Sequence, residues 1–106
     1  MLKKVEIGLL NDYYGGLLTE YQTRLLGMYY DEDLSLAEIA EVEGVSRQAI
    51  ADVIKRSSDK LNDYEERLGL VEKISKVIES LEQIIVSTDT ETAKKLQSIL
   101  DEVKEI

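Results

Sequence analysis

Few residue types in this chain could carry out covalent or metal chemistry. Its 106 residues include neither histidine nor cysteine, which excludes imidazole and thiolate metal ligands, disulfides and catalysis by Cys or His. The carboxylates form short stretches such as Asp31–Asp33, but no glycine-bearing calcium loop or partner base accompanies them. We therefore expect no enzymatic activity, no cofactor and no metal site.

One segment instead carries polar side chains at a spacing suited to nucleic-acid recognition. On a helix that begins after Ser46, Ile50 and Val53 fall on one side, which leaves a polar face for a groove. Arginine and glutamine match the edges of guanine and adenine, and basic side chains further along a helix meet phosphates. The predicted DNA-binding residues are Ser46, Arg47, Gln48, Ala51, Asp52, Lys55 and Arg56.

The elements that would position these side chains form a helix-turn-helix between Leu36 and Lys55. Ser35-x-x-Glu38 is a capping box that opens the first helix, Gly44 permits the positive φ of the turn, and Ser46 caps the second helix. Ala40 is small where the helices cross, and Val45 is expected to plug the angle between them. The shared core is expected to contain Ile39, Ile50 and Val53.

Helices are also predicted on both sides of this motif, in a chain that contains no proline. Apolar residues recur at helical intervals over residues 3–14, and Gly15-Gly16 ends that run. Thr19-x-x-Gln22 is a capping box for a second helix that ends near Tyr30. The fold class is therefore all-α, with a helix-turn-helix domain of three to four helices.

The helix after Ser46 continues as a heptad seam to Leu68, which is longer than DNA reading alone requires. The seam consists of Ile50, Ile54, Ser57, Leu61, Tyr64 and Leu68. Apolar stripes follow over residues 70–85 and 93–106, with Thr88-x-x-Glu91 predicted as the capping box between them. We expect a helix-turn-helix domain at 1–68, including the long recognition helix, and a C-terminal helical hairpin at 69–106 for dimerisation or packing.

Together with the seam from Ile50 to Leu68, these stripes expose more apolar surface than one short helical domain easily covers, so a homodimer is predicted. The alternative is that the hairpin folds back on its own domain. The six tyrosines follow the apolar faces, which favours packing over the stacking of nucleobases.

Charge argues against general adhesion to nucleic acid, because the chain carries a formal net charge of -9. The segment from Ser35 to Lys60 contains five acidic and four basic residues, so any contact with nucleic acid must be local. Asp52 would repel phosphate, accept from a cytosine amino group, or pair with Lys55 or Arg56. A helical corner that binds no nucleic acid is the alternative.

The N-terminal residues predict no export. Met1–Ile7 begins like a signal peptide, but Glu6, Asn11 and Asp12 interrupt the apolar region. No apolar run approaches the roughly 20 residues that span a bilayer. We expect a cytoplasmic protein without a membrane partner.

Several runs together make the sequence similar to a known family. They are Leu18–Gln22, Tyr29–Ala40, Val45–Ile50, Ile54–Arg56, Leu61 and Tyr64-Glu65. Over roughly the first two thirds of the chain these runs resemble the YlxM family. The resemblance implies a fold like the last, promoter-reading region of primary sigma factors, and a link to the signal recognition particle pathway, beside whose genes the family's genes lie.

Two functions remain open at this point. The first is a DNA-binding regulatory protein. The second is an adaptor that does not bind DNA and instead contacts the signal recognition particle GTPase or its RNA, which the acidity favours.

Overall fold

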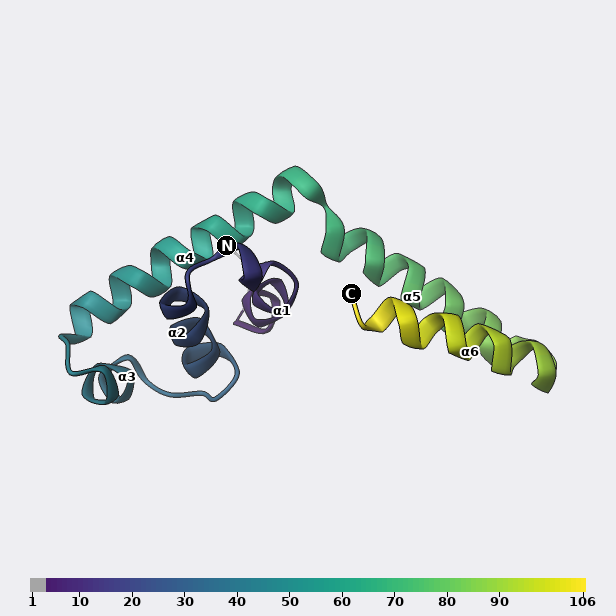
Figure 1. Ribbon diagram of the computed structural model, residues 1–106, viewed down its shortest axis with the longest axis horizontal. Helices are drawn as coiled ribbons and strands as arrows, with labels where there is room; N and C mark the ends of the chain where they lie inside the picture. The colour runs from purple at the N-terminus through teal and green to yellow at the C-terminus, as the bar shows by residue number, and fades with distance from the viewer. Residues whose placement is uncertain (1–3) are drawn as a thin grey trace. The chain divides into compact units, whose positions relative to one another are not determined.

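The computed structural model describes the backbone of residues 4–106 and the side chains from Glu6 onward, and its regular elements there are all helical (Figure 1). The helices are α1 Lys4–Tyr14, the short 3-10 helix η1 Gly15–Leu17, α2 Glu20–Tyr30, α3 Leu36–Glu43, α4 Arg47–Leu68, α5 Leu70–Ser87 and α6 Thr90–Lys104. The predicted all-α class is confirmed. Residue 3, where the first helix was predicted to begin, lies outside the described residues. Contacts divide the chain after Leu68 into a first unit and a second unit, Gly69–Ile106.

In the first unit, α1, α2 and α3 pack against α4 (Figure 1). The centre of this unit contains fully buried side chains from three of these helices: Leu25, Leu26, Ile39, Ile50 and Leu61. Tyr14 of α1 reaches the far part of α4, where its hydroxyl donates to Glu65 at 2.5 Å and its ring lies 5.9 Å from that of Tyr64. The long helix α4 is therefore the scaffold on which the other three are arranged.

The heptad seam of α4 faces its own unit. Ile50, Ser57 and Leu61 are fully buried, and only the last seam residue, Leu68, is more than half exposed, at 54%. The expectation that this seam needs a partner outside the domain is corrected, because α1, α2 and α3 cover it. The length of α4 is explained by packing within the unit.

Local capping residues set where α2 and α3 begin. Thr19 accepts from the backbone N–H of Gln22 at 3.1 Å, and the Gln22 side chain accepts from the backbone N–H of Thr19 at 3.0 Å. Ser35 and Glu38 make the same reciprocal pair at 3.1 and 3.0 Å. Both predicted capping boxes are confirmed, since each satisfies two backbone groups that an open helix end leaves unpaired.

The second unit is a hairpin of α5 and α6, which lie side by side (Figure 1). Its buried apolar side chains are Val71 and Leu100. Asp89, rather than the predicted Thr88, caps α6, and its carboxylate accepts from the Thr92 backbone N–H at 2.8 Å. The prediction was one residue early because a carboxylate caps as well as a hydroxyl does, and the Thr88 hydroxyl instead donates to Asp89 at 3.4 Å.

Among the described helices, none is both long enough and apolar enough to cross a membrane.

Candidate nucleic-acid interface

The turn between α3 and α4 has the backbone geometry that its sequence predicts. Gly44 ends α3 with φ 70° and ψ 32°, in the left-handed region that glycine enters without steric cost. The backbone N–H groups of Gly44 and Val45 both donate to the Ala40 carbonyl, at 2.9 and 3.2 Å. Ser46 then caps α4 by accepting from the Ala49 backbone N–H at 3.0 Å. These bonds fix the direction in which α4 leaves the turn.

The core beneath this turn is smaller than predicted. Ile39 and Ile50 are fully buried and Ala40 is 7% exposed, whereas Val53 is only half-buried. Val45 does not plug the angle between the helices, since it is 42% exposed. The turn closes through backbone bonds to Ala40 and does not require burial of the Val45 side chain. The corner therefore exposes apolar surface beside the start of α4.

The predicted DNA-binding residues lie at the cap and along the first half of α4. All of them are exposed except Ala51, which is half-buried. At about 100° per residue, Gln48, Asp52 and Lys55 form one line opposite the buried face. Arg47 and Arg56 flank that line on opposite sides, about 180° apart. The seven residues therefore do not share one face, and a flat surface that meets Arg47 would not meet Arg56.

Carboxylates occupy the middle of this exposed line. Gln48 donates through Nε2 to Oδ1 of Asp52 at 3.0 Å, so Asp52 is engaged by Gln48 rather than by Lys55 or Arg56. The Lys55 ammonium pairs with Asp59 at 3.1 Å, and both side chains are largely exposed. A ligand anion would have to compete with Asp59 for Lys55, although an exposed pair of this kind contributes little free energy and exchanges readily.

Glu43, at the end of α3, is tied to α2. The Arg24 guanidinium donates to the Glu43 carboxylate, and it lies 5.4 Å from the centre of the Tyr21 ring. The bond to Glu43 is the main reason that the pKa of Arg24 is raised. This pair links α3, the first helix of the motif, to the preceding helix α2.

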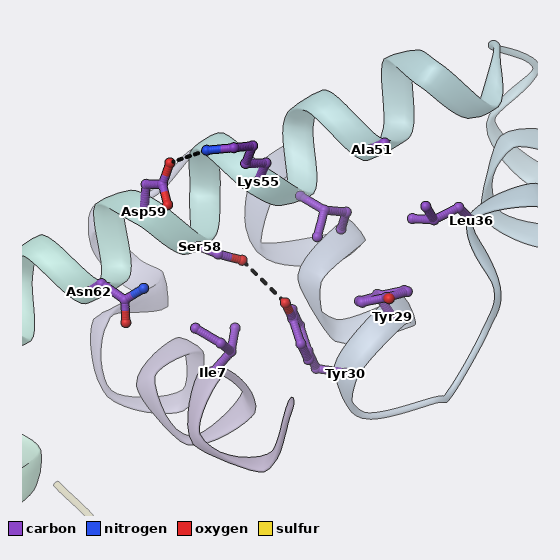
Figure 2. A pocket seen from close by; sticks show the side chains of 10 residues that line it. Ile7, Tyr29, Tyr30, Leu36, Ala51, Lys55, Ser58, Asp59 and Asn62 are labelled. Carbon is purple, nitrogen blue, oxygen red and sulfur yellow. Dashed lines mark hydrogen bonds and ion pairs between the residues drawn. The ribbon is translucent and has the colours of Figure 1, made fainter. Parts of the chain in front are cut away.

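A pocket of about 350 Å³ lies in the flank of α4, between α1, α2 and the start of α3 (Figure 2). Its wall is mostly apolar and aromatic, with contributions from Ile7, Tyr29, Tyr30, Leu36, Ala51 and Ile54. Tyr30 and Ser58 lie 3.4 Å apart between their hydroxyl oxygens, and the Lys55–Asp59 pair lies at the rim. Asn62 also lines it, and its buried Oδ1 has no hydrogen-bond partner among the residues that the structure describes.

Sequence reasoning identified Ala51 and Lys55 but missed the rest of this pocket. Its wall is drawn from four separate helices, so no single motif or repeat marks it. The best indication in the sequence is the helical spacing of Ala51, Ser58 and Asn62, which places small or polar residues on one flank of α4.

Comparisons with known proteins extend over both units. A family model described as "Putative helix-turn-helix protein, YlxM / p13 like" matches residues 1–103. A UPF0122 protein of Desulforamulus reducens is 55% identical over 80 residues, which cover 76% of this chain and 68% of the relative. One from Clostridium perfringens is 43% identical over 109 residues, which cover 97% of each chain. The similarity thus reaches beyond the first two thirds of the chain and includes the hairpin.

Proposed function

This chain belongs to the UPF0122 family of YlxM-like helix-turn-helix proteins, and on that premise we propose that it is a DNA-binding regulatory protein. The observation that carries the proposal is the start of α4, where Arg47 and Gln48 are exposed on the first turn after a capped, left-handed corner. In helix-turn-helix proteins the first turn of the second helix enters the major groove.

The proposed contacts divide into two classes. Arg47 and Gln48 read base edges, because a bidentate arginine matches guanine and an amide matches adenine. Lys55, further along the exposed line of α4, and Arg56, on the flank opposite Arg47, hold phosphates of the backbones that border the groove. Ser46 and Ala51 lie close to the DNA without being the source of specificity.

The carboxylates in the middle of the exposed line favour sequence-specific binding of DNA over general binding of any DNA. Asp52 and Asp59 repel phosphate, so binding to random DNA is weak. On the preferred site the correct bases engage Gln48 and release it from Asp52. Asp52 is then free to accept from a cytosine amino group.

The proposal is tested by selecting duplexes from a random library and titrating the best one against a scrambled duplex at stated salt. Arg47→Ala or Gln48→Ala should cost about 1–3 kcal/mol on the selected duplex and little on the scrambled one. Lys55→Ala should weaken both duplexes alike and lower the salt dependence by about one unit. Asp52→Asn should strengthen binding to the scrambled duplex.

The same titration can contradict the proposal. If selection yields no preferred duplex, or if Arg47→Ala binds the selected duplex as wild type does, α4 does not read bases. Glu79→Ala, on the exposed side of α5, is the matched control and should leave both affinities unchanged.

A second candidate function is an adaptor that contacts the signal recognition particle GTPase or its RNA. Two observations favour it: Val42 and Val45 are 64% and 42% exposed beside the corner, and carboxylates stand in the middle of the α4 face. Exposed apolar residues rimmed by charge are typical of protein interfaces. On this hypothesis wild type is captured by the purified particle, and Val45→Asp should abolish that capture while circular dichroism shows the helices retained. The DNA-binding proposal expects no capture at all.

The remaining parts of the proposal concern setting. We propose a binding role without catalysis, a cytoplasmic location and a homodimer. The family membership and the acidic, helical chain are compatible with all three.

A further inference from the structure

The hairpin of the second unit covers its apolar side chains unevenly. Facing α6, α5 presents Val71, Ile74, Ile78 and Leu81, of which only Val71 is buried. Val77 and Ile84 lie about 80–100° away from the centre of that stripe, toward one side of α5. They are 45% and 48% exposed, so α6 does not cover them.

Helix handedness places the uncovered residues of α6 on the same side. The stripe of α6 that faces α5 contains Ala93, Leu96, Leu100 and Val103, and Ile99 lies about 80° from its centre in the same rotational sense as Val77. Because the two helices run in opposite directions, equal rotational offsets bring Val77, Ile84 and Ile99 to one side of the pair. With Leu70, these residues form what we call the outer face of the hairpin: Leu70, Val77, Ile84 and Ile99.

An ion pair on the opposite side supports this placement. Glu82 and Lys104 both lie about 60° from the stripe centres in the other rotational sense, and the Lys104 ammonium lies 4.0 Å from the Glu82 carboxylate. That side is polar, and this ion pair joins α5 to α6 across it, whereas the outer face is apolar. Val86 also lies on the polar side and is 84% exposed, but no other large apolar side chain accompanies it there.

Charge makes the outer face the part of the hairpin best suited to meet an identical chain. Its border carries Lys73, Lys95 and Glu102 together with serines, so positive and negative charges are mixed. The opposite side carries more carboxylates than ammonium groups, with Glu72, Glu79, Glu82 and Asp101 against Lys94 and Lys104. For a chain with a net charge of -9, two copies repel each other least through the outer face.

We propose that the outer face binds the outer face of a second copy, so that two hairpins form a four-helix bundle around a two-fold axis. The period of the apolar residues, seven between Val77 and Ile84 and between Leu70 and Val77, suits the shallow crossing angles of such bundles. A two-helix face of this length covers roughly 500 Å² per copy, which is at the lower limit for a specific interface, so we expect a weak dimer whose population depends on concentration.

The proposal is tested on the full chain by sedimentation equilibrium over about 1–300 µM, a range that brackets micromolar association. Wild type should shift from monomer to dimer within that range. Val77→Glu and Ile99→Glu should each raise the dissociation constant at least tenfold, because each buries an unpaired carboxylate at the centre of the interface. The matched control is Val86→Glu, the same change on the opposite side, which should leave the dissociation constant unchanged.

Circular dichroism of every variant shows whether the helices are retained, and an unchanged spectrum assigns a loss of dimer to the face itself. A wild type that remains monomeric at every concentration overturns the proposal and favours a hairpin folded on its own first unit. Equal effects of Val77→Glu and Val86→Glu overturn it as well, since association would then lie elsewhere. None of these residues is among the proposed DNA contacts, so the outcome is independent of DNA binding.

Discussion

Single residues decide how closely the first two helices of this protein approach each other. Gly15 is buried just after α1, at the point where Thr23 of α2 donates to Asn11 of α1 at 2.6 Å. A Cβ atom at Gly15 would lie 2.6 Å from the Thr23 hydroxyl and 3.1 Å from Asn11 Oδ1. Gly16, the next residue, has no neighbour within 4 Å of such an atom.

Gly15→Ala should therefore destabilise the protein by roughly 1–3 kcal/mol, because the added methyl group forces the Asn11–Thr23 pair apart. Gly16→Ala is the matched control and should change the free energy of unfolding by less than about 0.5 kcal/mol. Urea denaturation followed by circular dichroism measures both. Equal stability of the two variants would mean that the close approach of α1 and α2 is not a constraint.

Residue-level features were predictable from sequence where their cause is local. The capping boxes at Thr19 and Ser35 and the left-handed Gly44 each follow from residues within one helical turn. The Asn11–Thr23 pair was not predictable, since it joins two helices. Val45 was misplaced for the same reason: whether an apolar residue at a corner is buried depends on how fully its distant neighbours fill the space.

At the scale of elements, α4 both scaffolds the first unit and presents the candidate reading surface. Its buried face holds Ile50, Ile54, Ser57 and Leu61, and its opposite face holds Gln48, Asp52 and Lys55. A substitution that repacks the buried face would therefore change the angle at which α4 presents its exposed face. The heptad pattern predicted correctly that one face of α4 is covered, but periodicity carries no information on whether the covering helices belong to the same chain.

The start of α6 gives the hairpin a dependence on pH. Hydrogen bonds from the backbone N–H and the hydroxyl of Thr92 lower the pKa of Asp89 below its usual 3.8. A carboxyl whose pKa is lower in the folded chain contributes stability above its unfolded pKa and loses it as pH falls through the folded pKa. We expect Asp89 to contribute fully at neutral pH and to lose that contribution only below about pH 3.8.

Asp89→Asn keeps a capping oxygen without the titrating proton. This variant should therefore show a smaller loss of thermal stability between pH 5 and pH 3 than wild type, to be measured as a difference in melting temperature at about 0.15 M salt. Identical pH profiles for the two proteins would exclude a role for the ionised Asp89 in capping.

At the scale of the whole molecule, excess negative charge sets how folding and binding respond to salt. The net charge is -9 and the isoelectric point is about 4.5, so repulsion within the chain is strong at neutral pH. Screening weakens that repulsion, and it equally weakens attraction to phosphate. Composition alone predicts this behaviour, whereas the division of the chain into a helix-turn-helix unit and a hairpin needed the pattern of apolar residues.

Raising NaCl from about 0.02 to 0.3 M at pH 7 should therefore increase the melting temperature while it decreases the proposed affinity for DNA. The control is the same change near pH 4.5, where the net charge is close to zero and the melting temperature should hardly move. A melting temperature that falls with salt at pH 7 would show that attractive surface ion pairs, such as Lys55–Asp59, outweigh the repulsion.

The contact between Tyr14 and Glu65 has a consequence for the order in which the protein can fold during its synthesis. These residues are 51 positions apart. A ribosome that adds about 5–20 residues per second needs roughly 3–10 s to make the intervening chain, whereas small helical units close in milliseconds or less. The apolar sides of α1 and α2 therefore remain uncovered for seconds, until α4 has been synthesised and can pack against them. During that interval they are open to chaperones and to neighbouring nascent chains.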